Sequence, residues 1–72
     1  MIIEFSNKDG GAVAIDTEDI ICIMADVQYN YEARVPPKLT GYHVIYLWGN
    51  NLFIIVTEST RDYVLRMWKD PV

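Results

Sequence analysis

The feature that most constrains this chain is the run HVIYLWGNNLFIIVT at residues 43–57, which is apolar at almost every position outside its centre. Gly49 and the two asparagines after it predict a hairpin, with its turn at 49–50 or at 50–51. Successive strand residues point to opposite faces, and either turn gives the same two faces. One face carries Ile45, Leu47, Leu52, Ile54 and Val56, and the other carries Val44, Tyr46, Trp48, Phe53 and Ile55. Both faces are apolar, so both need a cover.

The rest of the chain predicts further strands before this hairpin and one helix after it. Asp9-Gly10 between the apolar runs 2–6 and 12–15 is typical of a hairpin turn. Residues 16–19 form a polar connector, which we interpret as one helical turn capped by Asp16. Residues 20–27 then form a third strand, in which Ile21, Ile23 and Ala25 oppose Ile20, Cys22 and Met24.

The C-terminal segment has the pattern of a short amphipathic helix. Ser59 and Asp62 stand in capping-box spacing, and Pro71 would end the helix. Apolar residues recur at helical spacing between them, namely Tyr63, Val64, Met67 and Trp68. We therefore expect one β-dominated α+β domain over residues 1–72, with about five short antiparallel strands in a curved sheet or partial barrel. The helix should pack on one sheet face, which leaves the other for a second copy, a partner protein or curvature of the sheet itself.

Composition argues against several classes of function. The ten acidic residues outnumber the six basic ones, and the basic residues are scattered, whereas nucleic-acid binders usually carry a basic stripe. No apolar run approaches the roughly 20 residues of a membrane span, and the N-terminus lacks the pattern of a signal peptide. We therefore expect a cytoplasmic protein with no membrane partner, and the charge pattern disfavours nucleic acid as a partner.

The residue types that carry chemistry are too few and too scattered for a catalytic or metal site. His43 is the only histidine, and Cys22 is the only cysteine and lies inside an apolar strand. Asp16, Glu18 and Asp19 lack the further oxygen ligands of a calcium loop. We expect no enzyme activity, no metal and no cofactor.

The segment 28–42 is the best candidate for function, because long irregular loops on a rigid scaffold commonly bind partners. Its Pro36-Pro37 pair disfavours a central strand. It also carries residue types that are common in interface hot spots, and two hypotheses remain open for it. The loop is either a recognition surface or a cover for the second sheet face.

The second half resembles the FlbD-like group of small flagellar-operon proteins. The resemblance rests on Ile20 and Ile23, on the hairpin segments 44–47 and 55–57 with Gly49 between them, and on Glu58-Ser59 leading to Val64. The order of elements is similar to that of LytTR-type DNA-binding domains. The resemblance implies a small regulatory or assembly factor, but Asn50-Asn51-Leu52 stands where basic residues would be expected. We carry over neither flagellar function nor DNA binding.

These observations predict a non-catalytic interaction or assembly module that self-associates through an apolar sheet face. The expected interaction residues are Tyr29, Tyr31, Arg34, Lys38, Tyr42, Tyr46 and Trp48. One alternative is a regulator that binds nucleic acid through the loop carrying Arg34 and Lys38. Another is a small-ligand module with a pocket lined by Tyr29, Tyr31 and Tyr42.

Overall fold

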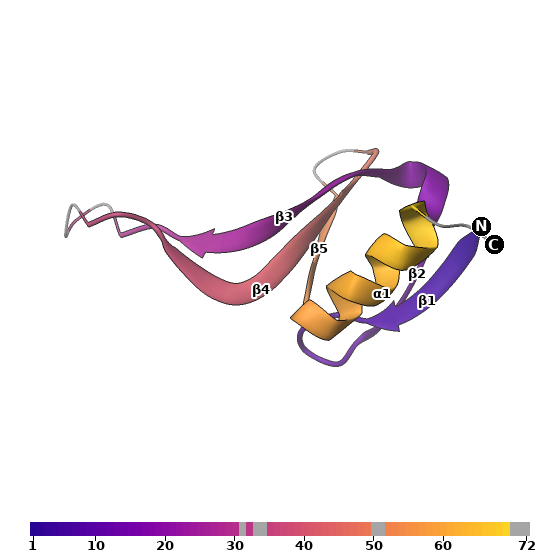
Figure 1. Cartoon of the computed structure of the whole chain (residues 1–72), viewed down its shortest axis with the longest axis horizontal. Coiled ribbons are helices and arrows are strands. Elements are labelled where there is room, and N and C mark those ends of the chain that lie inside the picture. The colour runs from indigo at the N-terminus through magenta and orange to yellow at the C-terminus, as the bar shows by residue number, and fades with distance from the viewer. Residues whose placement is uncertain (31, 33–34, 50–51, 70–72) are drawn as a thin grey trace.

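The computed structural model describes residues 1–30, 32, 35–49 and 52–69 of the 72-residue chain. Its elements, in chain order, are β1 (Ile2–Ser6), β2 (Ala12–Asp16), the short 3-10 helix η1 (Thr17–Asp19), β3 (Ile20–Gln28), β4 (Lys38–Leu47), β5 (Phe53–Val56) and α1 (Glu58–Lys69). The predicted β-dominated α+β fold with one C-terminal helix is confirmed (Figure 1). The strands divide between two antiparallel sheets, β1–β2 and β3-β4-β5, and the described strands do not close into a barrel.

The β1–β2 hairpin turns at the predicted Asp-Gly pair. Ser6 pairs with Ala12, so residues 7–11 form the turn. The side-chain oxygen of Asn7 accepts the N–H groups of Asp9 and Gly11, both at 2.9 Å. Gly10 takes a φ of 86°, a conformation that glycine adopts without the steric cost of a side chain. The connector after β2 is the predicted single turn, because Asp16 Oδ1 accepts the N–H of Glu18 at 3.0 Å.

The β4–β5 hairpin has the register of the turn at 49–50. Ile45 pairs with Ile54 and Tyr46 with Phe53, and the N–H of Leu47 donates to the carbonyl of Leu52 at 3.1 Å. Residues 50 and 51 themselves lie outside the described residues. The register gives the two predicted faces, which we call the inner face, toward α1, and the outer face.

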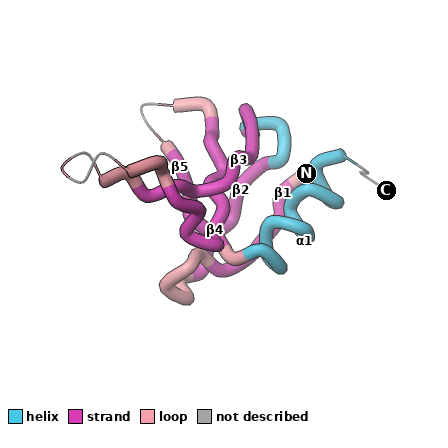
Figure 2. The backbone as a smooth tube through the Cα atoms, turned by 60° about the vertical axis from the view of Figure 1, so that its left-hand side comes forward, coloured by secondary structure: helices cyan, strands magenta, loops and turns pink. Residues whose placement is uncertain are grey.

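The core lies between the inner face, α1 and the β1–β2 hairpin. Ile45, Val56 and Val64 are fully buried. They form one cluster with Ile3, Ile15 and Ile20, and the predicted helix residues Tyr63, Met67 and Trp68 pack against it. Figure 2 shows the helix along one side of the strands. The predicted packing of the helix on one sheet face is confirmed.

The helix begins earlier than the capping-box spacing indicated. Glu58 is already helical, and the N–H of Thr60 donates to the side-chain oxygen of Thr57 at 3.4 Å. Thr57 is therefore the capping residue, and the prediction that Ser59 caps the helix is wrong. The chain passes from β5 to α1 through this single residue, so only Thr57 stands where a cap is needed.

A β-bulge near the start of β3 changes which of its residues share a face. Ile20 pairs with Leu47 and Cys22 pairs with Tyr46, so Ile21 is an extra residue in β3. Ile20 is consequently buried in the core while Ile21 is exposed. The expectation that Ile20 shares a face with Cys22 and Met24 is wrong, because simple alternation does not continue through a bulge.

A second irregularity bends the β3–β4 hairpin. Ala25 pairs with His43 and Val27 with Leu39, so three residues of β4, 40–42, stand opposite Asp26 alone. The Thr40 hydroxyl donates to Asp26 Oδ2 at 2.9 Å, and Gly41 has a φ of 88°. Beyond this bulge the hairpin continues as a narrow arm, made of the described residues 27–30, 32 and 35–39.

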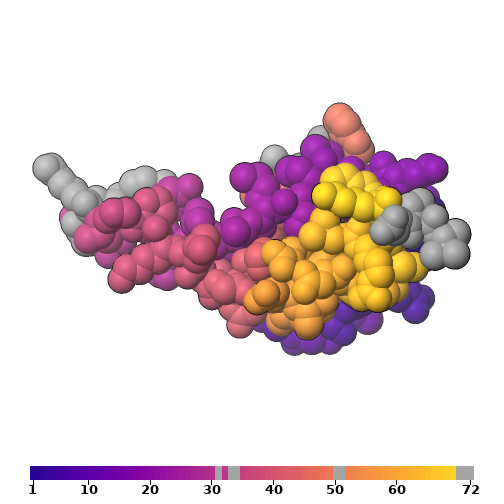
Figure 3. Space-filling model, in the orientation of Figure 1, coloured from indigo at the N-terminus to yellow at the C-terminus, as the bar shows by residue number. Residues whose placement is uncertain are grey.

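The irregular segment is shorter than the predicted 28–42. Gln28 ends β3 and pairs with Lys38, where β4 begins, so residues 38–42 belong to a strand. The two proline residues precede β4 and do not interrupt it. The arm stands away from the body formed by β1, β2 and α1 (Figure 3) and contributes to a longest dimension of 45 Å, against 25 and 23 Å for the other two.

Candidate functional site: the outer face of the three-stranded sheet

The outer face is built from two cross-strand rows of side chains. The register aligns Cys22, Tyr46 and Phe53 in one row and Met24, Val44 and Ile55 in the next. None of these side chains carries a formal charge. They lie on the face opposite Ile45 and Val56, so α1 does not cover them.

Several large side chains of this face remain exposed to solvent. Met24 and Phe53 are each 56% exposed and Tyr46 is 39% exposed. The Tyr46 and Phe53 rings are tilted by 43° with their centroids 6.4 Å apart, a distance typical of aromatic pairs. Val44, by contrast, is buried at the centre of the face.

One further apolar side chain extends the exposed surface beyond the two rows. Trp48, two residues beyond Tyr46, is 69% exposed. Its backbone N–H donates to the carbonyl of Asp19 at 2.9 Å, which fixes the backbone at that point. We call the four exposed residues Met24, Tyr46, Trp48 and Phe53 the outer patch. An exposed group of large apolar side chains commonly marks a protein interaction site.

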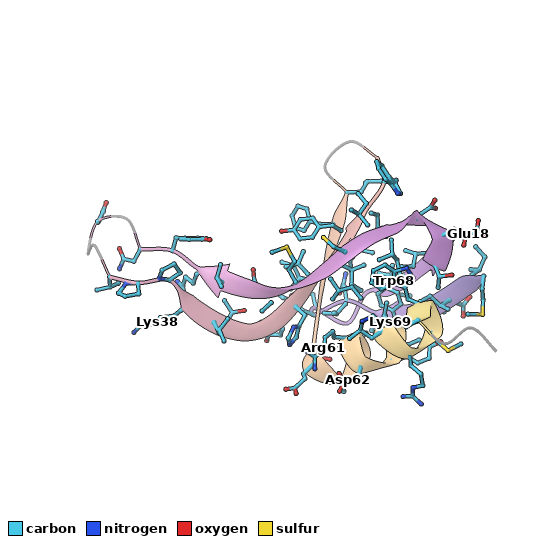
Figure 4. All side chains as sticks on the ribbon, turned by 45° about the horizontal axis from the view of Figure 1, so that its top comes forward. Glu18, Lys38, Arg61, Asp62, Trp68 and Lys69 are labelled. Atoms are coloured by element: carbon cyan, nitrogen blue, oxygen red, sulfur yellow. The ribbon has the colours of Figure 1, made fainter. Side chains whose placement is uncertain are left out.

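The structure divides the predicted interaction residues between two places. Tyr46 and Trp48 belong to the outer patch, while Tyr29 and Lys38 lie on the exposed arm. Figure 4 shows Lys38 far along the arm from Trp68 on the helix. Tyr42 lies in the bulge between the two places. Tyr31 and Arg34 fall outside the described residues.

Tyr42 also contacts the turn of the first hairpin. The Lys8 ammonium nitrogen lies 5.2 Å from the centroid of the Tyr42 ring, within range of a cation–π interaction. The N–H of Lys8 donates to the carbonyl of Ile55 at 2.8 Å. Lys8 therefore ties the β1–β2 turn to the three-stranded sheet beside the outer face.

Met24 and Phe53 belong to the outer patch but are not among the predicted interaction residues. Alternation places Met24 on the same face of its strand as Cys22, and Phe53 on the same face of its strand as Ile55. The sequence pattern is therefore enough to assign each residue to a face of its own strand. What the pattern could not show is that the rows of β3 and β5 lie together through β4. That neighbourhood depends on pairing between segments that are distant in the sequence.

The arm contains a hollow of about 220 Å³, lined by Gln28, Asn30, Val35, Pro36 and Lys38. Its volume lies below the range of about 300–1,000 Å³ that is usual for ligand pockets. Neither Tyr29 nor Tyr42 lines it, although both were expected to line a ligand pocket. This hollow therefore does not support the small-ligand hypothesis.

The other polar side chains form local contacts away from the outer patch. Arg61 on α1 contacts Asp62 at 2.7 Å and Glu58 at 3.8 Å. Cys22 and His43 are both half-buried within the sheet. Across the described residues, we find no group of three or more histidine, cysteine, aspartate or glutamate side chains that could hold a metal ion. In the same residues, α1 is too short and too polar to cross a membrane.

Comparisons with models of protein families, with curated proteins and with solved structures found no match to this chain. The resemblance to the FlbD-like group therefore stays a prediction.

Proposed function

We propose that the protein is a non-catalytic interaction module that associates with a second copy of itself through the outer patch. The observation that carries this proposal is the exposure of Met24, Tyr46 and Phe53 in two adjacent rows of a face that no described element covers, with Trp48 exposed two residues beyond Tyr46. The role we infer is regulatory or assembly-related, and the expected location is the cytoplasm.

Self-association fits the chemistry of this face. Its two rows are uncharged, although the chain carries a net charge of −4. Two copies can therefore bring their outer faces together without opposing like charges at the centre of the contact. The tilted Tyr46–Phe53 pair offers aromatic edges and faces that can interdigitate with the same pair in another copy, as an isologous interface requires.

The energy available from such a contact is appreciable. Burying one large apolar side chain completely contributes about 1.5–3 kcal/mol, and each outer-patch residue is already partly buried, so each contributes less than this. Part of that gain offsets the lost freedom of two separate molecules. We therefore expect association in the micromolar to submillimolar range.

The test is the absolute mass in solution, measured by light scattering after size-exclusion chromatography across that concentration range. Trp48→Ala and Phe53→Ser should each lower the association constant by about tenfold or more, while circular dichroism stays unchanged because both side chains are largely exposed. Leu39→Ser is the matched control, since Leu39 is a large side chain that is 73% exposed on the arm. It should leave the mass unchanged.

The outcomes separate the alternatives. A monomeric wild type at all concentrations would contradict the proposal. Dissociation by Leu39→Ser but not by Phe53→Ser would move the interface to the arm. Retardation of nucleic acid that disappears at high salt and in Lys38→Ala would instead favour the regulator that binds nucleic acid.

A further inference from the structure

We propose that β3 also pairs along its free edge with β3 of a second copy, joining two three-stranded sheets into one six-stranded antiparallel sheet. This contact uses the backbone edge of the sheet, and it stands on different observations from the contact through the outer patch.

The two edges of the three-stranded sheet differ in length and in their hydrogen bonds. The order β3-β4-β5 leaves β3 and β5 at the edges. The β5 edge is only four residues long, and its Ile55 carbonyl already accepts the N–H of Lys8. The β3 edge is nine residues long, and no described strand pairs with its other side. An unpaired edge presents a row of free N–H and C=O groups to any other strand.

The β3 sequence lacks most of the features by which proteins protect an edge strand. Such edges usually carry lysine, proline or inward-pointing charges. The segment IICIMADVQ contains no lysine, arginine or proline, and its one charge, Asp26, accepts the Thr40 hydroxyl. The bulge at Ile21 affects the start and the second bulge bends the hairpin at Asp26, so residues 22–25 are the regular stretch that remains for pairing.

The same sequence favours a second copy as the partner. Residues 20–25 carry no charge, so an antiparallel pair of β3 strands centred there opposes no like charges. A pair centred on Asp26 would bring two carboxylates together and is disfavoured. Directly opposed residues of an antiparallel pair share a face, so Cys22 and Met24 of the two copies would continue the apolar outer face across the junction.

The edge contact can be removed without touching the outer patch. Ala25 is exposed and pairs with His43, and alternation places its side chain on the inner side of the sheet. Ala25→Lys adds a charge of the kind that natural edge strands use against pairing. Ala25→Ser is the matched control, because it keeps a small side chain.

Light scattering on a set of four proteins distinguishes the two contacts. With both contacts present, the wild type should exceed the mass of a dimer, while Ala25→Lys and Phe53→Ser should each stop at a dimer and their combination at a monomer. If Ala25→Lys leaves the mass unchanged while Phe53→Ser lowers it, the edge proposal is overturned and the outer-patch proposal stands. The opposite pattern overturns the outer-patch proposal alone, and a monomeric wild type overturns both.

Cross-linking gives an independent readout of the pairing register. An isologous antiparallel pair brings only the residue on its twofold axis opposite its own copy, at Cα distances compatible with a disulfide. Cys22 is the only cysteine, so it can be compared with Ile23→Cys, Met24→Cys and Ala25→Cys, each made in a Cys22→Ser chain. One of these positions should cross-link under mild oxidation at least tenfold more than Leu39→Cys on the arm. Equal cross-linking at all positions would overturn the edge pairing.

Discussion

Val64 offers the most direct test of how the helix is held on the sheet. It is the fully buried residue of α1 and belongs to the core cluster with Ile45 and Val56. Val64→Ala removes two methyl groups, which costs about 1.6 kcal/mol in transfer free energy at about 0.8 kcal/mol per group. The cavity left behind adds about 1 kcal/mol. The higher helix propensity of alanine offsets about 0.5 kcal/mol of this cost, so the free energy of unfolding should fall by about 2 kcal/mol.

The measurement is the free energy of unfolding from urea titration, at one protein concentration because self-association would itself stabilise the fold. For a domain of this size, 1 kcal/mol shifts the melting temperature by about 4–8 °C, so Val64→Ala should melt about 8–16 °C lower. Arg66→Ala is the control, since Arg66 is exposed on the same helix. It should stay within about 0.5 kcal/mol of the wild type. A loss below about 0.5 kcal/mol for Val64→Ala would refute the packing of the helix on the inner face.

Two further predictions concern the bends and caps of the chain. Gly41→Ala should destabilise the fold by about 1 kcal/mol in urea titration, because a φ of 88° is costly for a side chain even though a Cβ there meets no other atom within 4 Å; unchanged or higher stability would contradict this. The pKa of Asp16 is lowered by the Glu18 N–H and then by the amino group of Met1. The stabilisation from ionised Asp16 is therefore present above pH 3.8, the ordinary pKa, and is lost as the pH falls through the lowered value. The stability gap between the wild type and Asp16→Asn, followed by thermal melts from pH 7 to pH 2, should close toward the acid end, and a constant gap would contradict the assignment.

The parts of the fold that sequence predicts correctly are those set by local periodicity. The two-residue period fixes the faces of β4 and β5, and the helical period fixes Val64 and Trp68 toward the core. The Asp9-Gly10 turn and the Asp16 cap are equally local, because their hydrogen bonds join residues at most four positions apart. Each of these features depends on a short stretch of chain.

The parts that sequence misses depend on pairing between distant residues. The start of β4 at Lys38 is stabilised by pairing with Gln28 across the arm, while the nearby prolines favour an irregular path. The bulge at Ile21 cannot be recognised in the sequence of an apolar run, because an isoleucine side chain can lie on either face of the sheet. The outer patch was therefore predicted only in part. Alternation already places Phe53 on the face of Tyr46 and Trp48, whereas Met24 joins them through the pairing of β3 with β4.

The second bulge also limits how far the outer face extends. The apolar face ends at the row of Met24, because the next outward position of β3 is Asp26, which bonds Thr40 in the second bulge. Two rows across three strands, at strand spacings of about 4.8 Å and row spacings of about 6.8 Å, cover roughly 200 Å². A standard stable interface buries about 800 Å² on each partner. The two rows of the outer face are therefore too small for a tight dimer, even with Trp48 added beside them. A dimer held by this face alone should therefore dissociate within the micromolar to submillimolar range, and a more stable assembly requires the added contact along β3.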